Sequence, residues 1–290
     1  MILRLRERRL ELPPGRRLLM GIVNASPDSF SDPGRRPLDE LVELARSRAR
    51  AGAELVDVGG ESGRTDREPV PEDEEIARVA PLTERLAADG IAVSVDTWRA
   101  PVARAALAAG AVMINDVSGL SDPGVADACA ESGAALVLTH TRVPPKQKGF
   151  PVYDDVVEDV AELLMERAAE ARARGVHDEQ LVLDPGIDLA KTPAESVEVI
   201  RRLPELARLG RPLLLAVSRK DFVGALTERP PAARLAGTLA AIGAAADGGA
   251  AILRVHDVAE ASDFLRVQAA LKDADGHVPH LAEELRREPV

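Results

Sequence analysis

Short apolar segments of strand length recur along the chain, and each is followed by an Ala-, Leu-, Arg- and Glu-rich stretch long enough for a helix. In order, the eight segments are LLMGIV, ELVDVG, IAVSVD, AVMIND, ALVLTH, LVLD, LLLAVS and AILRV. The helices that follow are expected to start near Pro37, Pro71, Ala100, Pro123, Pro151, Pro193, Ala232 and Val258. Five of these eight residues are prolines, which suit the first turn of a helix. The pattern therefore predicts a strand and a helix, repeated eight times.

Strands that are apolar on both faces and alternate with helices form a parallel sheet, and eight such units close a barrel. The sequence thus predicts an α/β fold, a (β/α)8 TIM barrel, as a single domain over residues 1–290 with its core at about 18–271. A doubly wound open sheet is the competing architecture. It usually has a glycine fingerprint after its first strand, and GIVNASPDS lacks G-x-G-x-x-G. Three long connections, at 24–36, 60–70 and 140–150, are expected to form lids.

Composition and charge exclude several classes of partner. The formal net charge is −11 and only 2% of residues are aromatic, which argues against nucleic acid and anionic membrane surfaces. The stretch LAGTLAAIGAAADGGAAIL is interrupted by Asp247 and is too polar for a membrane span. The single Cys129 excludes an intrachain disulfide, and the charged start of the sequence lacks a secretory leader. We therefore expect a cytoplasmic protein that acts on small molecules.

Polar residues follow most of the expected strands, at the end of the barrel where ligands bind in this fold. They are Asn24, Glu61, Arg64, Asp96, Asn115, Asp116, His140, Asp184, Ser218, Arg219, Lys220, Arg254 and His256. Singly, such residues also serve as helix caps or turn formers. Together they indicate a site, and strand alternation turns Asp96 into the barrel mouth and places Arg254 and His256 on one face.

The types of residue at these strand ends suggest which ligands they bind. A carboxylate accepts two parallel hydrogen bonds from a planar N–C–N edge, so Asp96 and Asp184, with Asn115 and Lys220, suit a guanidine-edge heterocycle such as a pterin. Arg254 and His256 are interpreted as paired cations for phosphate.

Two other segments are given no role in the site. The segment DPGIDLAKT fails the spacing of a P-loop, so Lys191 is interpreted as an ordinary residue at the start of a helix. The insert THTRVPPKQKGFP is interpreted as solvated rather than as a contact for a second substrate.

Seven blocks along the chain resemble the dihydropteroate synthase family, from about residue 18 to residue 271. They are MGIVNASPDSFSD, VDVGGES, SVDT, INDVSG, LDPGI, SRKDFVG and RVHDV. The resemblance implies a (β/α)8 barrel and a transferase of folate biosynthesis. The transferase that it implies joins 6-hydroxymethyl-7,8-dihydropterin pyrophosphate to p-aminobenzoate and releases pyrophosphate. Mg2+ as cofactor and a homodimer are implied as well.

The same resemblance implies roles for individual residues. The pterin is held by Asp96, Asn115, Asp184 and Lys220, of which Asp96, Asp184 and Lys220 are catalytic. Pyrophosphate is held by Asn24, Arg64, Arg254 and His256, with Asn24 also a ligand of the metal. The lids and the second-substrate pocket contain Phe30, Asp32, Gly63, Arg64, Leu189, Arg219 and Asp221.

The residues expected to bind the second substrate, p-aminobenzoate, depart from the family pattern. The family usually reads E-S-T-R-P, D-P-G-I-G-F-G-K-T and S-R-K-S-F where this chain has Gly63, Asp188-Leu189-Ala190 and Asp221. If Asp221 faced the pocket, a carboxylate about 4 Å from the substrate's would cost on the order of 4 kcal/mol at an effective dielectric of 20. If Asp221 instead points outward and caps the next helix, backbone amides stay free for the substrate.

These departures leave alternatives open. One is a paralogue that binds pterin but uses another acceptor or is non-catalytic, and another is a pterin-dependent methyltransferase. A folate methyl donor brings no leaving phosphate, so Asn24, Arg254 and His256 favour pyrophosphate chemistry over methyl transfer.

Overall fold

Eight parallel strands form one sheet in the order β8-β7-β6-β5-β4-β3-β10-β9. The computed structural model describes residues 1–26, 36–63, 65, 68–273, 282 and 285. The strands are β3 (Leu18–Asn24), β4 (Leu55–Gly59), β5 (Val93–Asp96), β6 (Met113–Asp116), β7 (Ala135–Thr139), β8 (Leu181–Asp184), β9 (Leu214–Leu215) and β10 (Ile252–Val255). A parallel bridge between Leu183 and Leu213 joins the two ends of the sheet. The predicted (β/α)8 barrel is confirmed, and each strand contains residues of one predicted segment.

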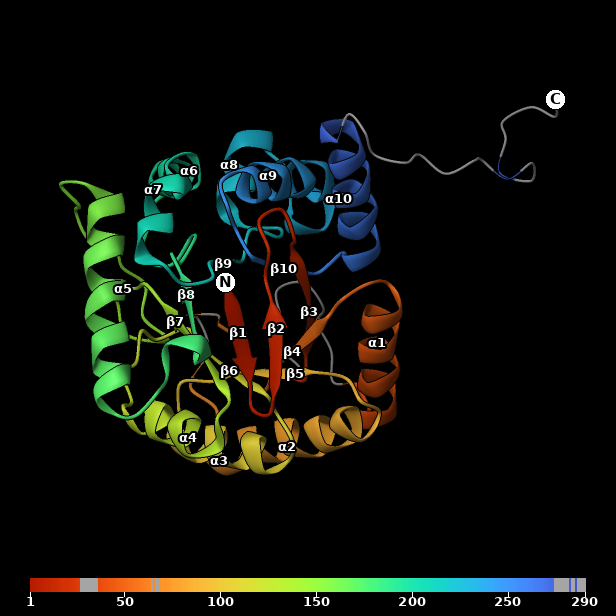
Figure 1. Ribbon diagram of the computed structural model, residues 1–290, viewed down its shortest axis with the longest axis vertical. Coiled ribbons are helices and arrows are strands. Elements are labelled where there is room, and N and C mark those ends of the chain that lie inside the picture. Colours follow the sequence, from red (N-terminus) through yellow and green to blue (C-terminus); the bar gives the residue numbers. More distant parts are fainter. Residues whose placement is uncertain (27–35, 64, 66–67, 274–281, 283–284, 286–290) are drawn as a thin grey trace.

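Helices surround the sheet, as Figure 1 shows. They are α1 (Leu38–Arg50), α2 (Glu72–Ala88), α3 (Ala100–Ala108), α4 (Gly124–Ser132), α5 (Val156–Ala173), α6 (Pro193–Arg201), α7 (Leu203–Leu206), α8 (Asp221–Thr227), α9 (Leu235–Asp247) and α10 (Val258–Lys272). Most begin close to the residues expected from the sequence. Helix α5 starts later than Pro151, because the Asp155 carboxylate caps it by accepting hydrogen bonds from the amides of Val157 (2.8 Å) and Glu158 (3.1 Å). None of the described helices is long and apolar enough to cross a membrane.

Two apolar layers follow from the alternation of side chains along the strands. Val93, Val95, Leu136 and Leu138 belong to the outer layer, which packs the helices onto the sheet. Leu18, Met20, Leu55, Met113, Ala135, Val137, Val182, Leu214 and Ile252 fill the barrel interior. Residues two positions further along a strand face the same way, so the inner side chains at the carboxyl ends of the strands line the mouth.

A hairpin that the sequence pattern did not predict closes the other end of the barrel. Its strands β1 (Ile2–Leu5) and β2 (Arg8–Glu11) pair antiparallel, and Figure 1 shows them in the middle of the ring of helices. Leu3, Leu5 and Leu12 are buried against the inner apolar layer. The hairpin therefore seals the amino-terminal end, and the carboxyl end remains for a site.

Candidate active site

A buried network of charged and amide side chains lies at the carboxyl ends of β4, β5, β6 and β10. Arg254 donates from Nε to Oδ2 of Asp57 (2.6 Å) and from Nη2 to Oδ2 of Asp96 (2.9 Å). Asn115 donates from Nδ2 to the same Asp57 oxygen (3.1 Å). Three residues expected from the sequence, Asp96, Asn115 and Arg254, are thus brought together.

Asp57 holds this network together, yet the sequence reasoning missed it. Its side chain is fully buried, and it contacts both Arg254 and Asn115. The signal was present in ELVDVG, where an ionisable residue interrupts an otherwise apolar strand. Buried charges of this kind are nearly always paired, so the lone carboxylate should have indicated a partner inside the barrel.

The network keeps Asp96 close to the point of protonation at neutral pH. Burial raises the pKa of Asp96 to about 7; the neighbouring Asp57 carboxylate adds to the rise and Arg254 opposes it. Burial also raises the pKa of Asp184, against the amide of Gly186 and the charges of Lys220, Lys191 and Arg254. Lys220 and Arg254 therefore both lie within electrostatic reach of Asp184.

A tightly bonded loop after β8 carries Asp184. The Gly186 amide donates to Oδ1 of Asp184 (2.7 Å), and Nζ of Lys191 donates to the carbonyls of Gly186 (3.0 Å) and Leu189 (3.2 Å). Lys191 is only 2% exposed, so its interpretation as an ordinary helix-start residue is wrong. It precedes α6 and fixes the loop, because its three donors are shared between two carbonyls and the ring of His140.

His140 points away from the mouth, although the sequence placed it among the strand-end residues. The last residue of β7 is Thr139, and the His140 ring lies between Nζ of Lys191 (2.7 Å from Nδ1) and Oδ1 of Asp159 on α5 (2.8 Å from Nε2). Burial and the Lys191 charge lower the pKa of His140 to about 4, so the ring is neutral near pH 7. Its role is to support the loop of Asp184.

His256 is a neutral hydrogen-bonding group rather than a second cation. Its Nδ1 lies 3.0 Å from Oγ of Ser218, and burial together with Arg254 and Arg219 lowers the pKa of His256 to about 3. Arg219 is ion-paired with Asp257 (2.6 Å between Nη2 and Oδ1). The interpretation of Arg254 and His256 as paired cations therefore holds for Arg254 alone.

Asp221 points outward, so the alternative in which it faces the pocket is wrong, and the other alternative is right only about the direction of the side chain. Its side chain is 86% exposed and its Oδ1 accepts from Nη1 of Arg234 (3.0 Å). It does not cap α8, and the first amides of that helix are not free. Oδ2 of Asp188 accepts from the amides of Asp221 and Phe222, while Oδ1 accepts from the hydroxyl of Ser196 (3.0 Å).

The loop after β4 is fastened to the insert after β7. Nζ of Lys146 donates to the carbonyl of Ser62 (2.9 Å) and lies 3.3 Å from Oε1 of Glu61. The interpretation of the insert as merely solvated is thus wrong for Lys146, whose side chain is mostly buried. A Cβ added at Gly63 would meet no atom of the described residues within 4 Å, so those residues leave open space beside this glycine. Phe30, Asp32 and Arg64 lie outside the described residues.

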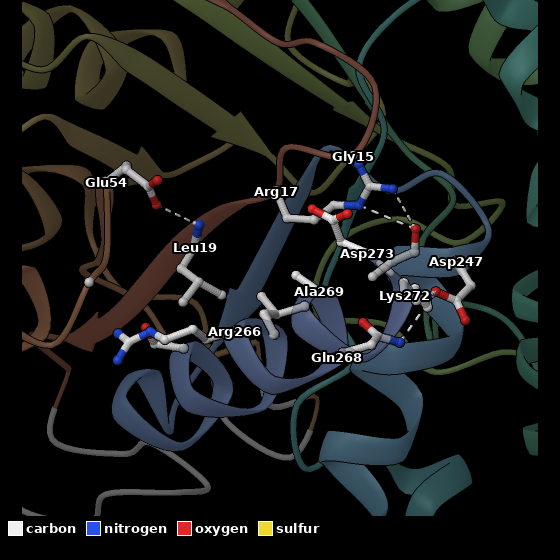
Figure 2. A pocket seen from close by; sticks show the side chains of 14 residues that line it. Gly15, Arg17, Leu19, Glu54, Asp247, Arg266, Gln268, Ala269, Lys272 and Asp273 are labelled. Atoms are coloured by element: carbon white, nitrogen blue, oxygen red, sulfur yellow. Dashed lines mark hydrogen bonds and ion pairs between the residues drawn. The ribbon is translucent and has the colours of Figure 1, made fainter. Parts of the chain in front are cut away.

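A hollow of about 700 Å3 lies at the opposite, amino-terminal side, between the start of β3, α9 and α10 (Figure 2). Its charged lining residues are bonded within the wall. Arg17 donates to the carbonyl of Ala246 (2.7 Å), Glu54 accepts from the amide of Leu19 (2.9 Å), and Lys272 pairs with Asp247. The barrel mouth, with its buried carboxylates, is therefore the stronger candidate for a site.

Comparisons with known proteins show which family the chain resembles. The family described as "Pterin binding enzyme" matches residues 20–256. The dihydropteroate synthase of Synechocystis is 40% identical over 261 residues, covering 88% of this chain and 90% of that protein. A probable bifunctional folylpolyglutamate synthase/dihydropteroate synthase of Haloferax volcanii is 44% identical over 257 residues. This match covers 88% of the chain but only 30% of the Haloferax protein.

Solved structures show the same similarity. The dihydropteroate synthase of Xanthomonas albilineans with 4-aminobenzoic acid superimposes with a TM-score of 0.86 at 43% identity. The match covers 94% of this chain and 99% of that one.

Proposed function

The chain belongs to the dihydropteroate synthase family, and we propose that its barrel mouth condenses 6-hydroxymethyl-7,8-dihydropterin pyrophosphate with p-aminobenzoate in folate biosynthesis. The observation that carries this site assignment is the network of Asp57, Arg254, Asp96 and Asn115, with Asp184 within electrostatic reach of Arg254. Buried carboxylates and an amide facing one lumen suit a flat heterocycle with several N–H donors. Pyrophosphate is the leaving group of this transfer.

The pterin is held by Asp96, Asn115, Asp184 and Lys220. Supporting this, Oδ1 of Asn115 is buried with no hydrogen-bond partner among the described residues, so it can accept from the ring. The raised pKa of Asp184 reflects burial in a site of low dielectric, where charges act strongly on a ligand.

The reaction exchanges one bond at the pterin methylene. The C–O bond to pyrophosphate breaks and its electron pair leaves with the pyrophosphate oxygen. The amine lone pair of p-aminobenzoate forms the new C–N bond, and the nitrogen then loses a proton to solvent. Asp96 and Asp184, when ionised, stabilise the positive charge that develops on the pterin. Arg254 attracts the leaving group, and His256 offers it a ring nitrogen as a neutral hydrogen-bonding group.

Mg2+ fits this mouth as an ion that arrives with the substrate. Among the described residues no group of three or more His, Cys, Asp or Glu side chains could hold a metal ion. Magnesium binds oxygen, keeps several waters and commonly uses substrate phosphates as ligands. Asn24, which ends β3 in register with Gly59 of β4, offers an amide oxygen there. Asn24 and pyrophosphate would hold the ion together, and the ion supplies positive charge to the leaving group.

The activity is tested by measuring pyrophosphate release from the pterin substrate with and without p-aminobenzoate. We expect release that depends on p-aminobenzoate, that stops when a chelator removes divalent cations, and that returns when Mg2+ is added. Pterin binding without release would instead indicate a non-catalytic pterin-binding barrel. Release that saturates with another amine but not with p-aminobenzoate would indicate a different acceptor.

Asp221→Ser is expected to leave the KM for p-aminobenzoate within about twofold of the wild type, because an exposed ion pair contributes little. The Asp221 carboxylate points to solvent rather than into the pocket. The matched variant is Asp188→Ala, which removes the carboxylate that does hold the first amides of α8. It should lower the free energy of unfolding by about 1 kcal/mol, as the loss of a helix cap does. A tenfold fall in the KM of Asp221→Ser would contradict this placement.

A homodimer is supported by an apolar face over three neighbouring helices. Helix α9 packs against both α8 and α10. The exposed side chains on these helices include Leu226, Ala236, Ala240, Ala244, Val267 and Leu271. Apolar side chains exposed on helices that pack side by side are typical of a subunit interface. Sedimentation equilibrium should give twice the chain mass, and Leu226→Lys with Val267→Lys should give the mass of one chain.

A further inference from the structure

Four buried polar atoms inside the barrel have no hydrogen-bond partner in the described part of the chain. They are Oδ1 of Asp57, Oγ of Ser94, Oδ1 of Asn115 and Oγ1 of Thr139. These atoms come from four consecutive strands, β4, β5, β6 and β7. Buried polar groups in native proteins are nearly always paired, because an unpaired one keeps its full cost of desolvation. Their concentration on adjacent strands marks the place where a polar ligand completes the structure.

Ser94 and Thr139 are the two members of this set without a role so far, and of these two only Thr139 ends its strand, at the mouth of the barrel. Ala135 and Val137 on the same strand belong to the inner apolar layer, whereas Leu136 and Leu138 belong to the outer one. Thr139 therefore faces the lumen by alternation, and it is 1% exposed.

The strand register places Thr139 beside a proposed pterin ligand. Thr139 pairs in register with Asp184 on β8, and neighbouring strands lie about 4.8 Å apart. Both residues end their strands. On the other neighbouring strand, β6, Asn115 pairs in register with Val137, which is the inward-facing residue just below Thr139 on β7. Thr139 thus lies beside one proposed pterin ligand, Asp184, and one inward-facing position above the level of another, Asn115.

We propose that Thr139 is a specificity-determining residue of this enzyme, whose hydroxyl hydrogen-bonds to the pterin held at Asp184. The inference rests on the proposed function of the barrel mouth. A hydroxyl both donates and accepts, so it can pair with either a ring N–H or a ring acceptor. Valine has nearly the same shape but can do neither, and a pterin bound beside it would leave one polar atom unpaired.

The test compares Thr139→Val with Thr139→Ser, which keeps the hydroxyl. Calorimetric titration with 6-hydroxymethyl-7,8-dihydropterin pyrophosphate, without p-aminobenzoate, should show a Kd about tenfold higher in Thr139→Val, equivalent to about 1.4 kcal/mol. Thr139→Ser should bind within about threefold of the wild type. The KM for p-aminobenzoate should stay unchanged in both variants.

Thermal unfolding without ligand separates this role from a structural one. Thr139→Val removes a buried unpaired hydroxyl, so its Tm should equal or exceed that of the wild type while its affinity falls. A lower Tm with an unchanged Kd would show a structural hydroxyl and overturn the inference, as would wild-type affinity in Thr139→Val. If Thr139→Val does not fold, Thr139→Ala against Thr139→Ser makes the same comparison. Wild-type protein that gives no heat with the pterin would overturn the proposed function as well.

Discussion

Replacing Asp184 with asparagine should weaken binding of the pterin substrate by roughly 30- to 4,000-fold. This is the effect of about 2–5 kcal/mol expected when one partner of a buried charged hydrogen bond is altered. The substitution keeps an oxygen for the Gly186 amide, so the loop after β8 retains its shape. It replaces the other acceptor oxygen with an N–H donor, which faces the donors of the pterin edge. Calorimetric titration with the pterin pyrophosphate measures the change in Kd.

Asp116 supplies the matched control for this experiment. It is a fully buried carboxylate that ends β6, two strands away from β8 in the sheet. It accepts hydrogen bonds from the amides of Ser118 (2.7 Å) and Leu120 (3.0 Å) instead of lining the mouth. Asp116→Asn should lower the Tm while leaving the Kd for the pterin near the wild-type value. Equal losses of affinity in the two variants would show that Asp184 acts on the fold rather than on the ligand.

Arg254→Gln should lower the free energy of unfolding by about 3–5 kcal/mol at pH 8, because it leaves the fully buried carboxylate of Asp57 and the partly buried one of Asp96 without their cation. Urea unfolding followed by circular dichroism measures this loss. The loss should become smaller at acidic pH. The pKa of Asp96 is about 7 in the folded protein, above its ordinary value of 3.8. Its contribution to stability is therefore fully present below pH 3.8 and is lost as the pH rises through 7.

Arg254→Gln removes the positive charge that opposes the rise in the pKa of Asp96. In this variant Asp96 should therefore take up its proton at a still higher pH. Near pH 5 the protonated carboxyl no longer repels Asp57, and the difference from the wild type shrinks. Arg254→Gln combined with Asp57→Asn should recover part of the stability, because it removes a carboxylate left unpaired. A loss of stability that does not vary between pH 5 and 8 would contradict the role of Asp96.

The strands and the inward direction of their polar residues could be predicted because both depend on local periodicity. Apolar segments fixed the strands, and alternation along LLLAVS and IAVSVD carries through to Ser218 and Asp96. Since the carboxyl ends of all the strands meet at one mouth, Asp96, Asn115 and Arg254 could be expected together without knowing any distance.

Features that depend on contacts between distant segments could not be predicted in the same way. Lys191 resembles a helix-start residue in sequence, and only the packing of the loop against His140 shows that it is buried. Asp188 holds the start of α8 across a gap of more than thirty residues, so neither segment indicates the contact alone. The charge of His256 is likewise decided by its burial beside Arg254, a tertiary effect.

The apolar side chains that fill the barrel, with the hairpin packed beneath them, leave the barrel with a single opening at its carboxyl end. Leu3 and Leu5 sit beneath the inner apolar layer, so no reactant can pass through from below. The reactant that binds deepest must then enter first. A molecule bound nearer the rim must depart before the deeper one can leave. A compulsory sequence of binding and release would thus follow from the way the barrel interior is filled.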